Sequence, residues 1–395
     1  MSPHSTNLSH GPTTVAIPGP SIVPPRVLAA MARPLPDIYE GELIDTSDAV
    51  FRMLPGLVGT AGDAYVAISN GHGGWEMALT NTLSRGDRVL VADCGLFAAV
   101  WADMARALGL DVELLHAADG RAVDPAVVGE RLAADTGHAI KALLLTHVDT
   151  ASSIRNDIPA MRAALDAAGH PALLMVDSIA SIGCEPYRMD EWGVDVTISA
   201  SQKGLMTPPG LAFVWVGDKA WAAHQTAGLR TAYWDWTPRR NPDANYLRFC
   251  GTPPVSHLFA LQEALAMIAE EGIENVWARH AALAGAVRAA VAAWSTPDGL
   301  SLWAAESSER ANSVTTINTG TIDAGLLRKV AQHEFGVTLG IGLRAFGDTS
   351  FRIGHMGYIS AGSVLGVLGV VEAALQRIGA PIGTSGVAAA AAALA

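Results

Sequence analysis

A lysine placed shortly after an apolar run is the first candidate for chemistry in this sequence. Lys203 follows the run 194–199 and precedes Gly204 and a turn at 208–210. A lysine amine forms Schiff bases with carbonyl groups, and partial burial lowers its pKa and makes it nucleophilic. The alternative is a lysine that extends its charged end into solvent from the end of a strand.

An acidic residue stands at the end of a second apolar run. Asp177 directly follows the run 173–176 and precedes Lys203 in the sequence. Pyridoxal phosphate chemistry needs both groups, because the lysine binds the cofactor aldehyde and a carboxylate keeps the pyridine nitrogen protonated. The alternative for Asp177 is a helix N-cap after a strand.

A stretch of small residues, Ser-Asn-Gly-His-Gly-Gly at 69–74, follows a third apolar run. Small residues let backbone N–H groups approach a phosphate, and a helix N-terminus adds partial positive charge. The spacing matches neither a nucleoside-triphosphate P-loop nor a dinucleotide fingerprint. The alternative is an ordinary tight strand-to-helix connection.

Composition narrows the class of protein that could carry these residues. The 395 residues have a formal net charge of −12, half are hydrophobic and 16% are charged. An acidic chain argues against nucleic-acid or anionic-membrane partners, and this composition argues against disorder. Three distant cysteines form neither a disulfide framework nor a metal pattern, and the first residues lack a secretory signal, so we expect a cytoplasmic protein without a metal.

The elements that must position these residues alternate along the chain. Strand candidates lie at 65–69, 88–92, 112–116, 142–146, 173–177, 194–199 and 212–216. Helical patterns lie between them at 74–83, 97–108, 125–134 and 158–168. This alternation predicts an α/β fold, a three-layer sandwich with a mostly parallel central sheet and at least one antiparallel pair where the last two strands approach.

Four segments are expected along the chain. A proline-rich extended arm occupies 1–35, a large domain 36–296, a smaller C-terminal α+β domain 297–386, and an alanine-rich tail 387–395. The smaller domain is predicted from helical patterns before 297 followed by strand candidates at 314–318 and 351–353 and a helix at 324–335. The alanine run is low in complexity and is expected to be a frayed helix or a disordered tail.

Several motifs together resemble the class V, fold-type I pyridoxal-phosphate aminotransferases, within them the serine–glyoxylate and alanine–glyoxylate group. The matching stretches, in chain order, are 18–21 with 24–26, Asn70-Gly71-His72, Val176-Asp177-Ser178, 189–195, Ser201-Gln202-Lys203, 208–210, Gly251-Thr252-Pro253 and Arg352-Ile353-Gly354. The resemblance covers nearly the whole chain and implies a homodimer whose site is shared between subunits.

The resemblance implies a role for each matching residue. Lys203 would bind the cofactor and move the substrate α-proton, Asp177 would pair with the pyridine nitrogen, and Phe97 and Ile179 would lie on opposite faces of the ring. Arg352 would bind the substrate α-carboxylate through its planar guanidinium.

The phosphate-side residues follow from the same resemblance. Asn70, Gly71, His72 and Gln202 would surround the cofactor phosphate, and Thr252 would reach it from the neighbouring subunit.

This sequence departs from the family pattern at three places. Thr150 stays near the cofactor, but Ala151 replaces a hydroxyl-bearing residue. The tyrosine that relatives place beside Thr252 is absent, and Tyr246 is a candidate substitute. The segment 36–51, which lines the substrate entrance in the family, is an insert of different sequence.

The expected reaction is transamination of a small L-amino acid (serine, alanine or aspartate) with glyoxylate or a similar 2-oxo acid. Candidate partners for a second substrate carboxylate are Arg230, Arg239, Arg240 and Arg344, although each is expected to be a solvated surface charge. One alternative is a class V lyase or cysteine desulfurase, which needs a mobile reactive cysteine. Such a cysteine usually lies much farther beyond the lysine than Cys250, which stands beside Thr252 instead. The other is a non-catalytic protein that binds pyridoxal phosphate.

Overall fold

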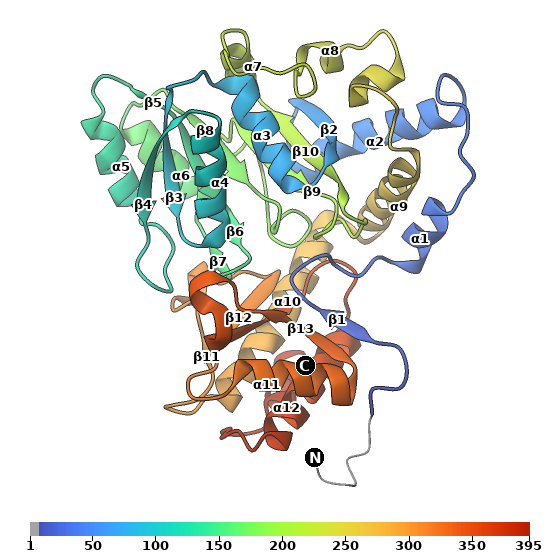
Figure 1. Ribbon diagram of the computed structural model, residues 1–395, viewed down its shortest axis with the longest axis vertical. Helices are drawn as coiled ribbons and strands as arrows, with labels where there is room; N and C mark the ends of the chain where they lie inside the picture. The colour runs from blue at the N-terminus through green and yellow to red at the C-terminus, as the bar shows by residue number, and fades with distance from the viewer. Residues whose placement is uncertain (1–7) are drawn as a thin grey trace.

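A seven-stranded sheet lies at the centre of the larger part of the molecule (Figure 1). The computed structural model describes residues 8–395, apart from the side chains of residues 344–346. The strands, in their order across the sheet, are β2 (Asp63–Ser69), β10 (Gly210–Val216), β9 (Val196–Ala200), β8 (Leu173–Asp177), β5 (Ile140–Thr146), β3 (Arg88–Asp93) and β4 (Asp111–His116). Strands β9, β8, β5, β3 and β4 pair in parallel, and β10 pairs antiparallel with both β9 and β2. The mostly parallel sheet with an antiparallel pair is confirmed.

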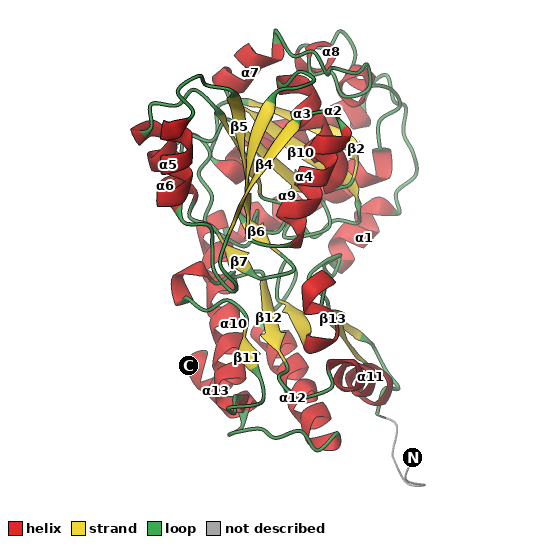
Figure 2. Cartoon of the chain, turned by 60° about the vertical axis from the view of Figure 1, so that its left-hand side comes forward, coloured by secondary structure: helices red, strands yellow, loops and turns green. Residues whose placement is uncertain are grey.

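Helices cover both faces of this sheet, which makes the predicted three layers (Figure 2). One face packs against α3 (Gly71–Thr82), α4 (Leu96–Ala107) and α7 (Asp218–His224). The other face packs against α2 (Glu42–Val58), α5 (Pro125–Ala134), α6 (Ile158–Ala167) and α9 (Val255–Glu271). Because side chains alternate along a strand, Leu143 and Leu145 of β5 point to the second set of helices while Ala142 and Leu144 point to the first.

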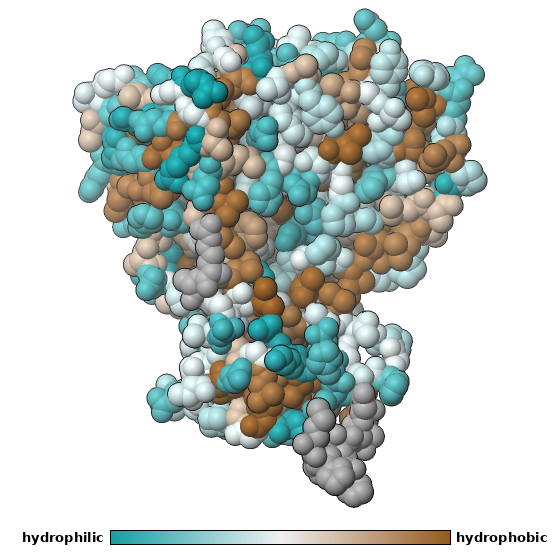
Figure 3. All heavy atoms as spheres, in the orientation of Figure 1, coloured by the Kyte–Doolittle hydropathy of each residue, from teal (hydrophilic) through white to brown (hydrophobic). Residues whose placement is uncertain are grey.

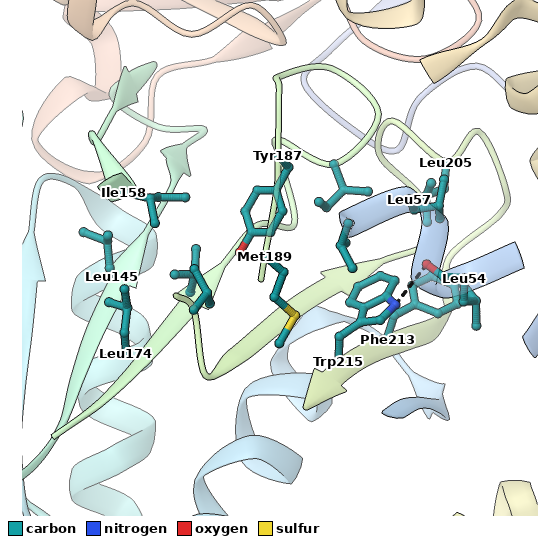
Figure 4. Packing of buried hydrophobic residues seen from close by; sticks show 14 of the residues in the cluster. Leu54, Leu57, Leu145, Ile158, Leu174, Tyr187, Met189, Leu205, Phe213 and Trp215 are labelled. Atoms are coloured by element: carbon teal, nitrogen blue, oxygen red, sulfur yellow. Dashed lines mark hydrogen bonds between the residues drawn. The ribbon is translucent and has the colours of Figure 1, made fainter. Parts of the chain in front are cut away.

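Helix α2 is not among the predicted elements, and the hydrophobic core beneath it shows what anchors it to the sheet (Figure 4). Leu54 and Leu57 pack near Phe213 and Trp215 of β10, and the Trp215 indole donates a hydrogen bond of 3.1 Å to the Leu54 carbonyl. Burying a large apolar side chain of this kind contributes roughly 2–3 kcal/mol. Helix α2 occupies most of the segment 36–51 and continues to Val58, so the insert is a packed helix on the sheet.

A second, five-stranded sheet forms the core of the smaller part (Figure 1, lower half). In order across the sheet, its strands are β1 (Thr14–Ala16), β13 (Val337–Ile341), β14 (Ser350–Gly354), β12 (Val314–Asn318) and β11 (Ser301–Leu302). Helices α10 (Ile273–Trp294), α11 (Ala324–Phe335), α12 (Ala361–Arg377) and α13 (Gly386–Ala393) supply the rest of its hydrophobic core. The smaller C-terminal α+β unit is confirmed.

The core of the smaller part also includes segments from the N-terminal arm and from the residues before 297. Strand β1 pairs in parallel with β13, and Leu283 to Trp294 of α10 pack with β12 and β14. Helix α13 covers most of the segment 387–395 and packs on α10, where a Cβ at Gly386 would overlap the Trp294 ring. The division of the chain at residues 35, 296 and 386 stays a prediction.

Short elements complete the described chain. They are α1 (Pro25–Met31), β6 (Val148–Asp149), β7 (Ile154–Arg155), α8 (Thr237–Arg240), and the 3₁₀ helices η1 (Asn245–Phe249), η2 (Ser307–Glu309) and η3 (Arg344–Thr349). The face in Figure 3 intersperses hydrophobic and hydrophilic side chains. Over residues 8–395, no helix has the length and apolar character that a membrane crossing needs.

Candidate active site

Lys203 lies in the turn that follows β9, beneath the N-terminal arm. Its Nζ donates a hydrogen bond of 2.5 Å to the Pro18 carbonyl, and the Ser21 hydroxyl donates one of 2.7 Å to the Lys203 carbonyl. A Cβ at Gly19 would overlap the lysine side chain, so glycine lets the arm approach this closely. Burial and, after it, the nearby Arg352 charge lower the pKa of Lys203 to about 8. This is the environment expected of a nucleophilic lysine.

Asp177 is the last residue of β8, and its carboxyl group is buried at 3% exposure. One oxygen accepts a hydrogen bond of 2.8 Å from the Ile179 N–H. Burial raises the pKa of Asp177 to about 7 and the Asp149 charge raises it too, whereas the Ile179 N–H, the Trp75 indole and Lys203 oppose this rise. The side chain is not an N-cap of a helix, because the backbone after it forms a turn.

Eight of the predicted site residues line one cavity of about 110 Å³. The complete lining is Gly71, His72, Trp75, Phe97, Val148, Thr150, Asp177, Ile179, Ala180, Gln202 and Lys203. Parallel strands end at the same edge of a sheet, which is why β8, β9 and the loops after β2 and β3 meet here. Sequence reasoning missed Trp75, Val148 and Ala180. The position of Trp75, on the helix after the glycine-rich turn, was the one available signal.

A larger cavity of about 760 Å³ opens beside the starts of α5 and α6. It contains none of the predicted site residues. Size alone is a weaker criterion than the convergence of a lysine and a carboxylate, so we assign the active site to the smaller cavity.

The N-terminus of α3, for which the sequence predicts a phosphate-binding role, forms one wall of the cavity. Asn70 is exposed and caps the helix, because its side-chain oxygen accepts a hydrogen bond of 3.1 Å from the His72 N–H. A Cβ at Gly71 would overlap Ile179, and one at Gly73 would overlap the Ser69 side chain. Glycine is therefore required for the close packing of the helix start against the sheet.

Phe97 is held at the cavity by a buried carboxylate from another element. Asp149 is fully buried and accepts hydrogen bonds from the Phe97 N–H at 2.6 Å and the Ala98 N–H at 3.4 Å. Its other oxygen accepts from the N–H groups of Ala151 at 2.8 Å and Ser152 at 3.3 Å. Burial raises the pKa of Asp149, and these N–H groups oppose the rise. Asp149 thus fixes the start of α4, a role that sequence reasoning missed.

Arg352 lies beside the cavity, outside its lining, on β14. Its Nη1 donates a hydrogen bond of 2.8 Å to the Thr150 carbonyl, and its Nε donates one of 2.7 Å to the Ile341 carbonyl. The residue is 7% exposed, and burial lowers the pKa of the guanidinium to about 10. The contact brings the smaller part of the molecule against a residue that lines the cavity.

Other candidates lie away from this cavity. Thr252 is exposed and does not line it. Tyr246 packs edge-on against Tyr39, with ring centroids 6.2 Å apart, in a different pocket. The placement of these residues leaves the phosphate-side roles of Thr252 and Tyr246 untested.

The prediction of solvated arginines is wrong for Arg239. It is 4% exposed and donates hydrogen bonds to the carbonyls of Val66, Arg248 and Tyr233, because the loop around it folds back onto β2. Arg240 pairs with Asp63 at 2.8 Å, and Arg230 Nε donates to the Ala227 carbonyl at 3.2 Å. The side chain of Arg344 lies outside the described part of the structure.

The residues around the cavity fit pyridoxal phosphate. Two buried polar atoms that line it, Trp75 Nε1 and Gln202 Oε1, have no hydrogen-bonding partner among the described residues. The cavity combines a lysine of lowered pKa, a buried carboxylate, an aromatic ring and a helix N-terminus. In that order, these groups suit the aldehyde, the pyridine nitrogen, the ring face and the phosphate of the cofactor.

Comparisons with known proteins agree with this arrangement. The family model "Aminotransferase class-V" matches residues 64–356. The serine–glyoxylate aminotransferase of Methylorubrum extorquens is 41% identical, covering 95% of this chain and 94% of the relative. The L-aspartate–glyoxylate aminotransferase of Paracoccus denitrificans is 41% identical, with 95% and 94% covered.

Solved structures of similar proteins share the whole fold. The ureidoglycine–glyoxylate aminotransferase from Bacillus subtilis superposes with a TM-score of 0.88 at 26% identity, covering 97% of this chain and 98% of that one. The pyridoxamine–pyruvate aminotransferase from Mesorhizobium loti gives 0.89 at 28% identity, with 97% of each chain covered. The chain belongs to the class V aminotransferases, which are fold-type I enzymes that depend on pyridoxal phosphate.

Proposed function

We propose that this enzyme transfers the amino group of a small L-amino acid to glyoxylate. The observation that carries the proposal is that Lys203 and Asp177 line one small cavity, with Arg352 directly beside it. Relatives named serine–glyoxylate and L-aspartate–glyoxylate aminotransferases support glyoxylate as the acceptor. The reaction then runs as two half-reactions at one site, in which the amino acid leaves as a 2-oxo acid before glyoxylate enters.

The cofactor would be held by residues from four elements. Asp177 would pair with the pyridine nitrogen, Phe97 and Ile179 would lie on the two faces of the ring, and the start of α3 with Gln202 would bind the phosphate. When bound, pyridoxal phosphate supplies an electron sink that stabilises negative charge at the substrate α-carbon. Thr150 completes the wall next to Arg352.

Lys203 would act as the acid and base of the reaction. Its pKa of about 8 leaves a useful fraction of neutral amine near neutral pH, so it can accept a proton from the substrate α-carbon and later return one. The N-terminal arm, which bonds Lys203 through Pro18 and Ser21, would limit the access of water to the amine.

Arg352 would bind the α-carboxylate of both substrates. A guanidinium presents two parallel N–H groups to a carboxylate, which orients it as well as attracting it. Its bonds to the carbonyls of Thr150 and Ile341 fix the direction of the side chain before substrate binds.

The amino donor is proposed to have a small uncharged side chain. Among the described residues that line the cavity, Lys203 is the one lysine or arginine, and Arg239 and Arg240 are engaged elsewhere. A second carboxylate, as in aspartate, would need a further cation from Arg344 or from a neighbouring subunit. We therefore expect serine and alanine to react faster than aspartate.

A homodimer in the cytoplasm is proposed as the working form. Thr252 is exposed on one chain, as it must be to reach the site of a second copy. Large apolar side chains are exposed near the start of the chain, on β2 and in the loop before α8. They are Ile22, Leu28, Leu35, Tyr39, Ile68 and Tyr233. Light scattering of the purified enzyme would give its mass, and a monomer would contradict the shared site.

The lyase or desulfurase alternative finds little support. Cys250 is exposed and lies within 3.5 Å of the Ala232 carbonyl, and no cysteine contributes to the described lining of the cavity. Cys94 and Cys184 are buried, and burial raises the pKa of each thiol. A thiol in these surroundings is a weak nucleophile.

The visible absorption of the bound cofactor tests the proposal. Serine or alanine should bleach the band near neutral pH and glyoxylate should restore it, with ping-pong steady-state kinetics. The Lys203→Ala variant should lose turnover almost completely. A band that no donor bleaches would contradict transamination, and faster bleaching by aspartate would place a second cation at the site.

A further inference from the structure

Trp75 is a buried aromatic residue of the cavity that the proposed mechanism has not used. It lies on the second turn of α3, is fully buried, and shares the cavity lining with Asp177. Its indole stacks on Trp101 of α4, with ring centroids 5.8 Å apart and an angle of 16° between the planes. The His72 ring lies on it as well, at 4.5 Å between centroids. Packing therefore fixes the plane of the indole.

The indole N–H is the polar part of this side chain. Within residues 8–395 it makes no hydrogen bond of standard geometry, although it is inaccessible to solvent. A buried donor without an acceptor costs roughly 1–3 kcal/mol, so a residue of this kind needs an explanation in a native site. The indole N–H also favours the charged form of the Asp177 carboxyl group.

Asp177 needs such a donor. The Ile179 N–H is the one hydrogen bond to its carboxylate that the described residues make at standard distance. A carboxylate that pairs with a protonated pyridine must be ionised and must keep one oxygen directed into the cavity. An indole N–H can donate but cannot accept, so it stabilises an acceptor and cannot satisfy a carboxylic acid O–H.

We propose that Trp75 is a positioning residue, whose indole N–H donates to the Asp177 carboxylate and holds it ionised and oriented for the cofactor. The proposal rests on the proposed role of Asp177. The Ile179 N–H already holds one oxygen of the carboxylate, which leaves the other oxygen to accept from the indole. Trp75 and Asp177 line the same cavity, and Trp75 would act on the cofactor through Asp177.

Other charged or titratable groups lie around Asp177 and also affect its ionisation. Asp149 of β6 opposes its ionisation and Lys203 favours it, while Tyr187 is affected by its charge. His72 lines the same cavity, and the His147 N–H donates to the Asp177 main-chain carbonyl. None of these groups is replaced in a Trp75 variant. His72 is the one that also packs on the Trp75 ring, and an isosteric ring without the N–H keeps that contact.

Affinity for pyridoxal phosphate as a function of pH tests the proposal without using turnover. Cofactor-free Trp75→Phe should bind the cofactor about tenfold more weakly at pH 7, as expected for the loss of a hydrogen bond to a charged group. The pH below which affinity falls should move up by about one unit, because Asp177 then ionises less readily. Fluorescence titration from pH 6 to 9 gives both quantities.

Trp101→Phe is the matched control. Trp101 is equally buried, belongs to the same stack and also has a buried indole N–H without a partner in the described chain, but it does not line the cavity. It should keep the wild-type pH profile of cofactor affinity. If the two variants show the same pH profile of cofactor affinity, whether or not it differs from wild type, Trp75 is only a packing residue and the proposal is overturned.

Two further variants separate the possible failures. In an Asp177→Ala background, Trp75→Phe should cause no additional loss of affinity, whereas additive losses would contradict action through Asp177. If Asp177→Ala alone keeps wild-type affinity, the proposed function of Asp177 fails. Should Trp75→Phe not fold, site-specific 3-benzothienylalanine at position 75 keeps the ring shape without the N–H and must give the same tenfold loss.

Discussion

At the scale of single residues, the site contains two ionisable groups, Lys203 and Asp177, whose burial favours the uncharged form of each. Lys203 is moved towards its neutral form by burial and by Arg352, and Asp177 is moved towards its neutral form by burial and by Asp149. Each shift is a cost to the folded protein without ligand, because the charged forms are better solvated in the unfolded chain. A bound cofactor that engages both groups would relieve that cost.

Replacement of Lys203 tests this cost directly. The pKa of Lys203 is about 8 in the folded chain, below the ordinary value near 10.4. Between these pH values the unfolded state binds more protons, so stability rises with pH there, and below pH 8 the penalty is complete. Cofactor-free Lys203→Met should therefore be more stable than wild type at pH 7, by up to about 3 kcal/mol, and this advantage should shrink towards pH 10.

Urea unfolding of cofactor-free protein at pH 7 and pH 10 measures the difference. Lys219→Met is the control, because the Lys219 side chain is 41% exposed and its amine lies 3.5 Å from the Asp195 carboxylate. It should show no stabilisation at either pH. A Lys203→Met variant that is less stable than wild type at pH 7 would mean that the bond to Pro18 outweighs the burial of the charge.

At the scale of elements, helix α4 depends on a carboxylate that is remote in the sequence. Gly95 precedes the helix and provides no side-chain cap, and Asp149 of β6 supplies the acceptor instead. A Cβ at Gly95 would overlap that carboxyl group, so the glycine allows Asp149 to reach the helix start. Phe97, the ring-stacking candidate, is the second residue of this helix and is positioned by the same bond.

Asp149→Ala should destabilise both the fold and the site. Four backbone N–H groups lose their acceptor in a buried place, for which we expect a loss of about 2–4 kcal/mol in the free energy of unfolding. Pyridoxal phosphate should also bind more weakly, because the start of α4 and Phe97 are released. Asp103→Ala on the exposed face of α4 is the control and should change stability by less than about 0.5 kcal/mol.

The elements divide into those that local sequence predicts and those that depend on distant partners. Leu173–Asp177 and Pro125–Ala134 end where the sequence pattern predicts, since a buried strand and a proline-started helix carry their own boundaries. Helix α2 escaped prediction because Pro55 lies inside it and its partners come from β10 and α9. Strand β13 is short and glycine-flanked, and pairing with β1 and β14 defines it.

The site shows the same division. Lys203 and Asp177 stand at strand ends that periodicity locates, so their meeting could be predicted. Arg239 looked like a solvated charge, because the carbonyls that surround it, such as that of Val66, are brought there by the fold. Trp75 was hidden for a similar reason, since a tryptophan on an apolar helix face is more often core than site.

At the scale of the whole molecule, the two sheets meet at the active site through polar contacts. Thr316 of β12 donates to the Ala151 carbonyl at 2.9 Å, and Arg352 of β14 donates to the Thr150 carbonyl. Both acceptors lie in the turn next to Asp149. Arg352, the proposed substrate-binding residue, is thus placed by the contact between the two parts, which we call the seam. Any movement of one part against the other would change its distance to Lys203.

A buried carboxylate, Glu185, holds the same seam at a second place. Glu185 follows Cys184 in the loop between β8 and β9, is fully buried, and accepts hydrogen bonds from the backbone and side-chain N–H groups of Asn312. The Asn312 carbonyl is paired in turn with His355, just beyond β14. Burial raises the pKa of Glu185 to about 7, with Arg155 and Arg288 opposing. This chain of contacts links the lysine side of the site to the strand that carries Arg352.

Glu185→Ala should therefore loosen the seam and act on substrate more than on cofactor. Removing one partner of a buried polar pair leaves Asn312 unsatisfied, so we expect the free energy of unfolding to fall by about 3 kcal/mol. The KM for the amino donor should rise several-fold while the dissociation constant for pyridoxal phosphate stays within a factor of two. The reason is that the side chains proposed to hold the cofactor belong almost entirely to the larger part.

Glu306→Ala, at an exposed site 4.0 Å from Arg121, is the control and should change neither quantity. Equal losses of cofactor affinity and donor affinity in Glu185→Ala would contradict this prediction. The effect of Glu185 would then reach Lys203 through Cys184, and the alignment of the two parts would not depend on this carboxylate.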